Sequence, residues 1–231
     1  MKSINWERWG AATGYLVAVL GVAAASFERG APPASAPGEE ILAFLLKYRS
    51  ELLAQSLLFV LSAGVYLWFF GSLRYYLAKG EAGSDRLATV AYGAGVIWAG
   101  LQMMLQSVQI ALAMGSSVDT DPALAGMMGG LTYAISVTAY VPMGIMLAAV
   151  AAAAFRTGIL PAWLGWFSTI SSIANLCMVF GVVTNKGLLV PGGVFTYALY
   201  AMMPIWLLSV TTVLCMRLGK HASPKETSPG M

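Results

Sequence analysis

The sequence predicts an all-α integral membrane protein: a bundle of six transmembrane helices with one additional amphipathic helix on the membrane surface. Of its 231 residues, 58% are apolar and only 10% are charged, whereas about 25% of the residues of a soluble domain are charged. So few charged groups cannot cover the surface of a soluble chain, but they suit a protein whose outer face lies in lipid. We expect a single membrane domain over residues 1–218 and a polar cytoplasmic tail over residues 219–231.

Six apolar runs are long enough to cross a membrane. A spanning helix needs about 20 mostly apolar residues to cross about 30 Å of hydrocarbon. The predicted spans are residues 9–27, 54–77, 87–113, 130–155, 161–183 and 194–217. The first run also has features of a signal peptide, namely Lys2 and Arg8 before it and small residues at 22–26. We expect a retained helix, because the apolar stretch is longer than a usual signal core. Pro142 and Pro204 lie within spans, where each favours a kink.

The basic residues predict the orientation of these spans, because cytoplasmic segments of membrane proteins are enriched in Lys and Arg. With the N-terminus inside, nine basic residues fall in inner segments and four in outer segments. The inner ones are Lys2, Arg8, Arg74, Lys79, Arg86, Arg156, Arg217, Lys220 and Lys225, and the outer ones are Arg29, Lys47, Arg49 and Lys186. Both termini should therefore be cytoplasmic.

The first outer loop should carry the additional helix. Residues 28–40, ERGAPPASAPGEE, are rich in proline and should be extended. Over residues 38–52, apolar side chains then recur at helical spacing, which is typical of an amphipathic helix lying in the interface. These side chains are Ile41, Phe44, Leu45, Tyr48 and Leu52. We expect a second short surface element at residues 122–130. Each element could either seal the bundle or act as a lid over an outward-facing pocket.

The sequence lacks the residues that are typical of several functional classes. No Asp, Glu, Lys, Arg or His lies near the middle of a predicted span, which argues against proton-coupled transport, pumping and acid–base catalysis at membrane depth. The single histidine, His221, lies in the polar tail, so haem ligation by paired histidines is excluded. Cys177 and Cys215 lie in apolar runs, and we expect both thiols to be inert. The absence of a basic cluster makes nucleic acid an unsuitable partner.

The 13 methionines raise a hypothesis of copper binding, because thioethers are soft ligands for Cu(I). Methionine is also the flexible residue that fills irregular apolar cores, and the sequence has no methionine-rich or histidine-rich outer segment to capture the metal. We therefore predict no metal site, and the sequence identifies no cofactor.

The clearest functional signal is a stripe of glutamines in the third span. Gln102, Gln106 and Gln109 fall within about 60° of arc on one helical face. Primary amides facing lipid would lack partners, so this face must turn toward protein or a water-filled cavity. Polar and aromatic faces on spans four to six offer matching walls. The candidate ligand-binding residues are Trp98, Gln102, Gln106, Gln109, Tyr133, Tyr140, Ser172, Asn175 and Tyr200. Alternatively, these polar groups join neighbouring helices by hydrogen bonds.

Residues 156–176, RTGILPAWLGWFSTISSIANL, resemble the fifth span of a family of small bacterial inner-membrane proteins classed as a domain of unknown function. The shared features are a short basic inner turn and the pattern Leu-Pro-x-Trp-Leu-Gly-Trp, which here occupies residues 160–166. Residues 66–96 are similar to the second and third spans of that family. The resemblance implies a multi-pass protein of the bacterial inner membrane. It implies no activity, and it assigns no role to any residue.

Three functions remain open from the sequence. In the first, the bundle binds or passes a lipophilic, largely uncharged small molecule through its glutamine-lined interior. In the second, the protein is a non-catalytic accessory subunit or assembly scaffold, whose stripe packs against a partner membrane protein or a second copy in the bilayer. In the third, it is an interfacial enzyme, which would require Arg74, Asp85 and Arg86 to converge with Arg156. An internal cavity touching the stripe favours the first function, and a stripe on the outside favours the second.

Overall fold

The computed structural model describes residues 6–33, 36–182 and 194–220, and all regular secondary structure in these residues is helical. The helices are α1 (Trp6–Ala25), α2 (Gly38–Lys47), α3 (Arg49–Gly80), α4 (Arg86–Gly115), α5 (Pro122–Thr157), α6 (Ala162–Met178), a 3₁₀ turn η1 (Val179–Val182) and α7 (Val194–Lys220). Within the described residues, six helices are long and apolar enough to cross a membrane, which confirms the predicted spans. The chain is thus a helical, multi-pass membrane protein. The predicted tail, residues 219–231, lies almost wholly outside the described residues.

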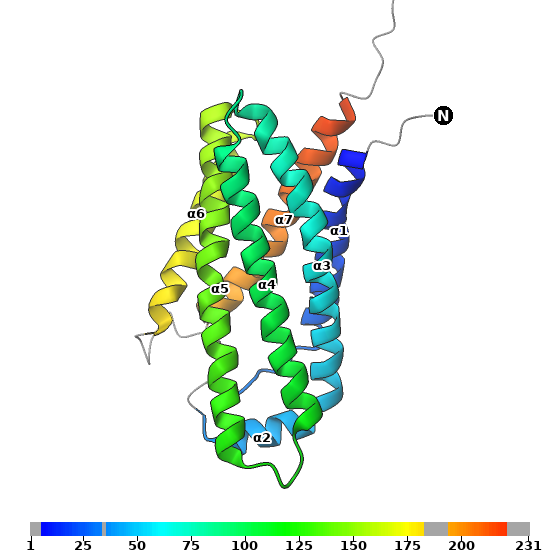
Figure 1. The fold of residues 1–231 in the computed structure, drawn as a ribbon, viewed down its shortest axis with the longest axis vertical. Coiled ribbons are helices and arrows are strands. Elements are labelled where there is room, and N and C mark those ends of the chain that lie inside the picture. The colour runs from blue at the N-terminus through cyan, green and yellow to red at the C-terminus, as the bar shows by residue number, and fades with distance from the viewer. Residues whose placement is uncertain (1–5, 34–35, 183–193, 221–231) are drawn as a thin grey trace, which may run out of the picture.

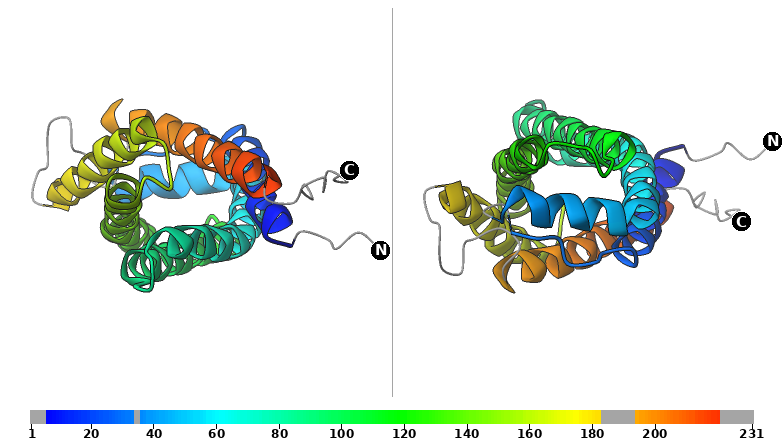
Figure 2. Two further views of the ribbon diagram at one scale, coloured as in Figure 1. Left: turned by 90° about the horizontal axis from the view of Figure 1, so that it is seen from above. Right: turned by 90° about the horizontal axis from the view of Figure 1, so that it is seen from below.

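The six long helices form a closed ring whose order follows the chain. α3 packs between α1 and α4, α5 packs between α4 and α6, and α7 completes the ring by contacting both α6 and α1. Figure 2 shows this ring along its axis, and Figure 1 shows that the start of α1 and the end of α7 lie at the same end. We call this the terminal end and the opposite one the α2 end. Six helices, an even number, run from one end of the ring to the other, so the start of α1 and the end of α7 lie at the same end.

The interior of the ring is filled in its terminal half. Phe69, Phe70 and Leu73 from α3 pack there against Leu147 from α5 and Trp206 from α7, all of them at most 2% exposed. At the rim of this end, the main-chain oxygen of Ile159 accepts hydrogen bonds from the Tyr76 hydroxyl and the Arg217 guanidinium. These contacts join α3 and α7 to the α5–α6 turn and close the terminal end.

The amphipathic helix is shorter than the sequence predicts. α2 ends at Lys47, and Tyr48 (φ −113°, ψ 25°) separates it from α3, which begins at Arg49. Residues 49–52 therefore belong to a spanning helix, and the predicted helix over 38–52 is wrong in its last third. The apolar periodicity continues through Tyr48 because Ile41, Leu45 and Leu52 contribute to one buried cluster. α2 lies across the α2 end of the ring (Figure 2, right).

Residues 122–130 do not form a separate surface element but are the first turns of α5. The Asp121 carboxylate accepts a hydrogen bond from the Ala123 N–H, and Pro122 occupies the first turn, a combination that starts a helix strongly. The helix then continues to Thr157, where Gly158 ends it in the left-handed conformation (φ 65°). The predicted surface element ended at the glycine pair Gly129 and Gly130. The prediction was wrong because α5 continues through both glycines.

Candidate functional site

The α2 half of the ring contains a cavity of about 500 Å³. All six long helices contribute to its walls. Six of the nine candidate residues line it: Trp98, Gln102, Gln106, Tyr140, Asn175 and Tyr200. A volume of this size falls within the range of about 300–1,000 Å³ that is usual for small-molecule sites.

Gln106 is the most distinctive residue of the cavity wall. It is 5% exposed, and its side-chain oxygen Oε1 is buried without a hydrogen-bond partner. Gln102 lies one turn earlier on α4 and lines the same cavity while half-buried. Both glutamines therefore face the interior of the ring rather than its outer surface. A buried oxygen without a partner costs about 1–3 kcal/mol. Protein atoms enclose this oxygen, so a ligand in the cavity would pair with the amide after the Gln106 side chain rotates toward it.

Gln109 also faces protein, but it does not line the cavity. Its amide Nε2 donates to Ser56 Oγ at 2.9 Å and to Gln55 Oε1 at 3.2 Å, and it approaches the main-chain oxygen of Leu52 at 3.4 Å. Gln55 in turn donates from Nε2 to Glu28 Oε2 at 2.8 Å. This series of hydrogen bonds connects the segment after α1 with α3 and α4. In the structure Gln109 therefore joins two helices.

Tyr133 and Ser172 likewise contact neighbouring helical segments instead of the cavity. The Tyr133 hydroxyl donates to the main-chain oxygen of Gly181 at 3.1 Å. The Ser172 hydroxyl donates to the main-chain oxygen of Gly144 at 2.7 Å, across the contact between α5 and α6. A Cβ atom on Gly144 would lie 2.7 Å from Leu176 Cγ, so this glycine permits the close approach that the hydrogen bond requires. Both residues have the helix-joining role that the sequence left open for them.

The deep end of the cavity, toward the filled half of the ring, is aromatic. Tyr66 lies edge-on to Trp98, with ring centroids 5.0 Å apart, and stacks on Phe70 at 5.1 Å. Met143 and Leu207, both at most 2% exposed, also line the cavity. Such packed aromatic and aliphatic side chains give this end an apolar surface with a fixed shape.

The polar groups of α5, α6 and α7 lie on the other walls of the cavity. The hydroxyls of Tyr140 and Tyr200 share a hydrogen bond. Asn175 is 2% exposed and donates from Nδ2 to the main-chain oxygen of Ser171 at 2.8 Å. The cavity thus combines apolar walls with a few neutral hydrogen-bonding groups, which is the usual composition of a small-molecule site.

The sequence analysis missed Glu28, Gln55, Ser62 and Tyr66. Glu28, Ser62 and Tyr66 line the cavity, and Gln55 is 5% exposed beside it. Gln55 could have been found, because it is an amide within a predicted span, as the three glutamines are. Glu28 carried no comparable signal, because it lies in a segment that reads as a solvated loop.

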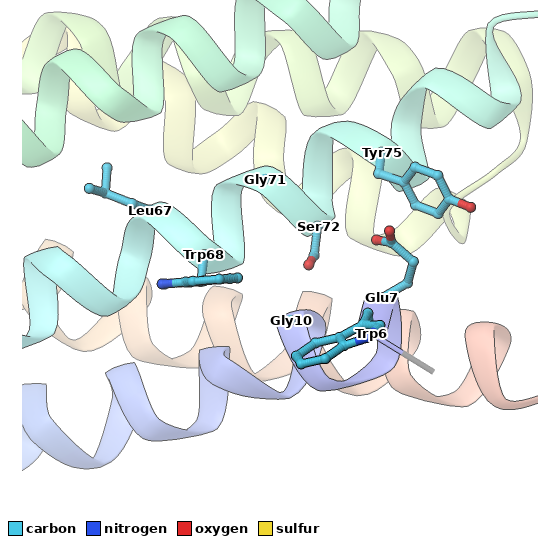
Figure 3. Close-up of a pocket in the computed structure, with 8 residues that line it drawn as sticks. All are labelled: Trp6, Glu7, Gly10, Leu67, Trp68, Gly71, Ser72 and Tyr75. Atoms are coloured by element: carbon cyan, nitrogen blue, oxygen red, sulfur yellow. The ribbon is translucent and has the colours of Figure 1, made fainter. Parts of the chain in front are cut away.

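A second cavity, of about 370 Å³, lies on the outside of the ring between α1 and α3 (Figure 3). Its walls include Trp6 and Trp68, which are 71% and 68% exposed, and the Ser72 hydroxyl points across it toward Gly10. A Cβ atom on Gly10 would clash with Ser72 Oγ. This groove is therefore where small residues bring two helices together beside exposed tryptophans, and small residues at helix contacts are a general feature of membrane proteins.

The residues needed for an interfacial enzyme lie at the terminal end and line neither cavity. Arg74 and Asp85 form an ion pair at 2.6 Å, with side chains 42% and 59% exposed. The neighbouring Glu81 carboxylate accepts the N–H groups of Leu87 and Ala88 and so caps the start of α4. These groups stabilise the α3–α4 turn, and an exposed ion pair contributes at most about 1 kcal/mol.

Comparison of the chain with family models, curated proteins and solved structures gives no match. The resemblance of residues 156–176 to a bacterial membrane-protein family stays a prediction.

Proposed function

We propose that this protein binds a lipophilic, largely uncharged small molecule inside its ring of helices. The observation that carries the proposal is the Gln106 amide, which lines a cavity of about 500 Å³ while its buried oxygen has no partner. A primary amide can offer either its oxygen or its NH₂ group by rotation. A ligand with one or two polar groups and an apolar body would complement both this amide and the aromatic end of the cavity.

The filled terminal half of the ring favours binding over passage. Phe69, Leu73 and Trp206 occupy the interior there, so a molecule crossing the ring would have to displace a packed core. The alternative function, an accessory subunit or scaffold, would use the glutamine stripe as an outer contact surface. Because Gln102 and Gln106 line the interior cavity, no feature of the stripe favours this alternative.

We further propose that the terminal end faces the cytoplasm of a bacterial inner membrane. The proposal rests on the excess of basic residues in the segments at this end and on the family resemblance. A fluorescent protein fused after residue 231 should fold and emit light, whereas alkaline phosphatase at the same position should be inactive. Active phosphatase there would contradict the proposed orientation.

The Gln106→Leu variant tests the proposed ligand site. We expect the amount of co-purifying small molecule to fall at least about tenfold relative to the wild type. The loss of one buried hydrogen-bonding partner should weaken the binding free energy by about 1.4 kcal/mol or more. The measurement is mass spectrometry of organic extracts from detergent-purified protein, normalised to protein content.

Gln109→Leu is the matched control, because it makes the same substitution three residues away on the same helix. Gln109 contacts α3 and not the cavity, so this variant should keep its ligand while its free energy of unfolding falls. Unchanged ligand content in Gln106→Leu, or equal loss in both variants, would count against the proposal.

A further inference from the structure

The cavity opens on one side, between the last part of α1 and the first part of α7. The cavity-lining side chains of α3, α4 and α5 are buried or half-buried, whereas Val22 is 61% exposed and Tyr197 and Tyr200 are 50% and 58% exposed. α1 and α7 touch nearer the terminal end, where the Tyr15 hydroxyl lies 3.0 Å from Thr212 Oγ1. They diverge toward the α2 end (Figures 1 and 2). We call this gap the lateral opening.

Glu28 stands at the lateral opening and is the one charged residue that lines the cavity within the described part of the chain. Its carboxylate accepts a hydrogen bond from the Gln55 amide Nε2 at 2.8 Å. The adjacent Arg29 does not line the cavity, and its guanidinium donates to the main-chain oxygens of Ser26 and Glu28. A carboxylate cannot face hydrocarbon without large cost, so Glu28 marks the level of the lipid head groups.

The opening therefore has two levels of different chemistry. At the level of Glu28, it presents a carboxylate, which accepts hydrogen bonds and attracts cations. Further toward the terminal end, Gly21 and Val22 leave an apolar gap facing the acyl chains. Behind this gap lie the neutral amides of Gln102 and Gln106. An amphiphile could enter sideways from the bilayer with its head group kept at the level of Glu28.

We infer that Glu28 selects the ligand by charge, so that the cavity takes single-chain amphiphiles with a neutral or cationic, hydrogen-bond-donating head group and rejects anionic ones. The inference rests on the proposed function and adds the class of ligand to it. An anionic head group placed beside the exposed Glu28 carboxylate would be repelled by it, and the cavity walls within the described residues hold no Lys, Arg or His to offset the carboxylate. A volume of about 500 Å³ suits one alkyl chain and not a two-chain phospholipid.

The test compares three probes of equal chain length: dodecanol, dodecylammonium and dodecanoate. Radiolabelled probes are equilibrated at neutral pH with the full chain in zwitterionic nanodiscs, and empty nanodiscs give the background. We expect dodecanol and dodecylammonium to bind at least about tenfold more tightly than dodecanoate. In Glu28→Gln, the difference between dodecanol and dodecanoate should fall below about twofold, because the charge that repels dodecanoate has been removed.

Glu40→Gln is the matched control, because Glu40 is an exposed carboxylate on α2 that does not line the cavity. This variant should keep the full discrimination between probes. Equal binding of all three probes by the wild type, together with weaker binding of all three by Gln106→Leu, would overturn charge selection while supporting the ligand site. Discrimination that persists in Glu28→Gln would also overturn it. If no probe binds above the background, both the ligand site and its selectivity are wrong.

Discussion

Replacement of Trp206 by alanine should lower the free energy of unfolding by about 3–5 kcal/mol, as expected for a large aromatic side chain in a packed interior. Trp206 is fully buried in the filled half of the ring. Its indole Nε1 donates to Ser168 Oγ at 2.8 Å, and that hydroxyl donates to the main-chain oxygen of Leu164. The substitution therefore removes both the packing between α7 and α3 and the hydrogen bond between α7 and α6.

Unfolding by SDS in mixed micelles, followed by circular dichroism, measures this loss. Trp163→Ala is the control, because Trp163 is 54% exposed on α6 and its removal should change stability by less than about 1 kcal/mol. Ser168→Ala leaves the indole N–H unpaired and should cost about 1–3 kcal/mol by itself. A loss below about 1 kcal/mol in Trp206→Ala would mean that the terminal half of the ring is not a packed core.

Gly14→Ala should lower the free energy of unfolding by about 1–3 kcal/mol, even though alanine normally favours a helix. Gly14 lies where α1 meets α3 and α7. A Cβ atom there would clash with Thr211 Oγ1 and lie 3.0 Å from Phe69 Cδ2. Both neighbours are buried, so α1 would have to move outward, and the ring would loosen on both sides of it.

Two further variants separate this clash from a general effect of the substitution. Gly64 lies within α3 with no atom near its would-be Cβ, so Gly64→Ala should be neutral or slightly stabilising. The Gly14→Ala/Thr211→Ala double variant should regain part of the lost stability, because the clashing hydroxyl, which is buried without a partner, has been removed. Equal stability of Gly14→Ala and Gly64→Ala in the same SDS titration would contradict the close contact.

The spanning helices could be predicted from sequence because each one must satisfy its own backbone and present apolar side chains to lipid. The inward orientation of Gln102 and Gln106 followed from the same argument. The boundary at Tyr48 could not be predicted, because apolar spacing continues across it from Leu45 to Leu52, and only the tertiary structure turns the chain there. The continuity of α5 through Gly129 and Gly130 was missed because paired glycines also suit a turn.

The site was predicted less completely, because periodicity places a residue on a face but does not identify its partner. Gln106 and Gln109 lie on the same stripe, yet one lines the cavity and the other bonds to Gln55 and Ser56. This difference depends on which side chains of α3 lie opposite each glutamine. The position of Glu28 at the cavity depends on where the chain passes after α1, which no local pattern encodes.

The placement of α2 has a mechanical consequence for the rim of the ring. A single non-helical residue, Tyr48, joins α2 to α3, and at the other end of α2 Gly38 packs so closely on the main chain of Pro122 that no side chain would fit between them. α2 therefore fixes the distance between α3 and α5 at the rim. Separating those two helices would break both attachments, whereas no helix among the described residues connects α1 to the start of α7 in this way. Opening motions of the rim should thus be concentrated on the α1–α7 side.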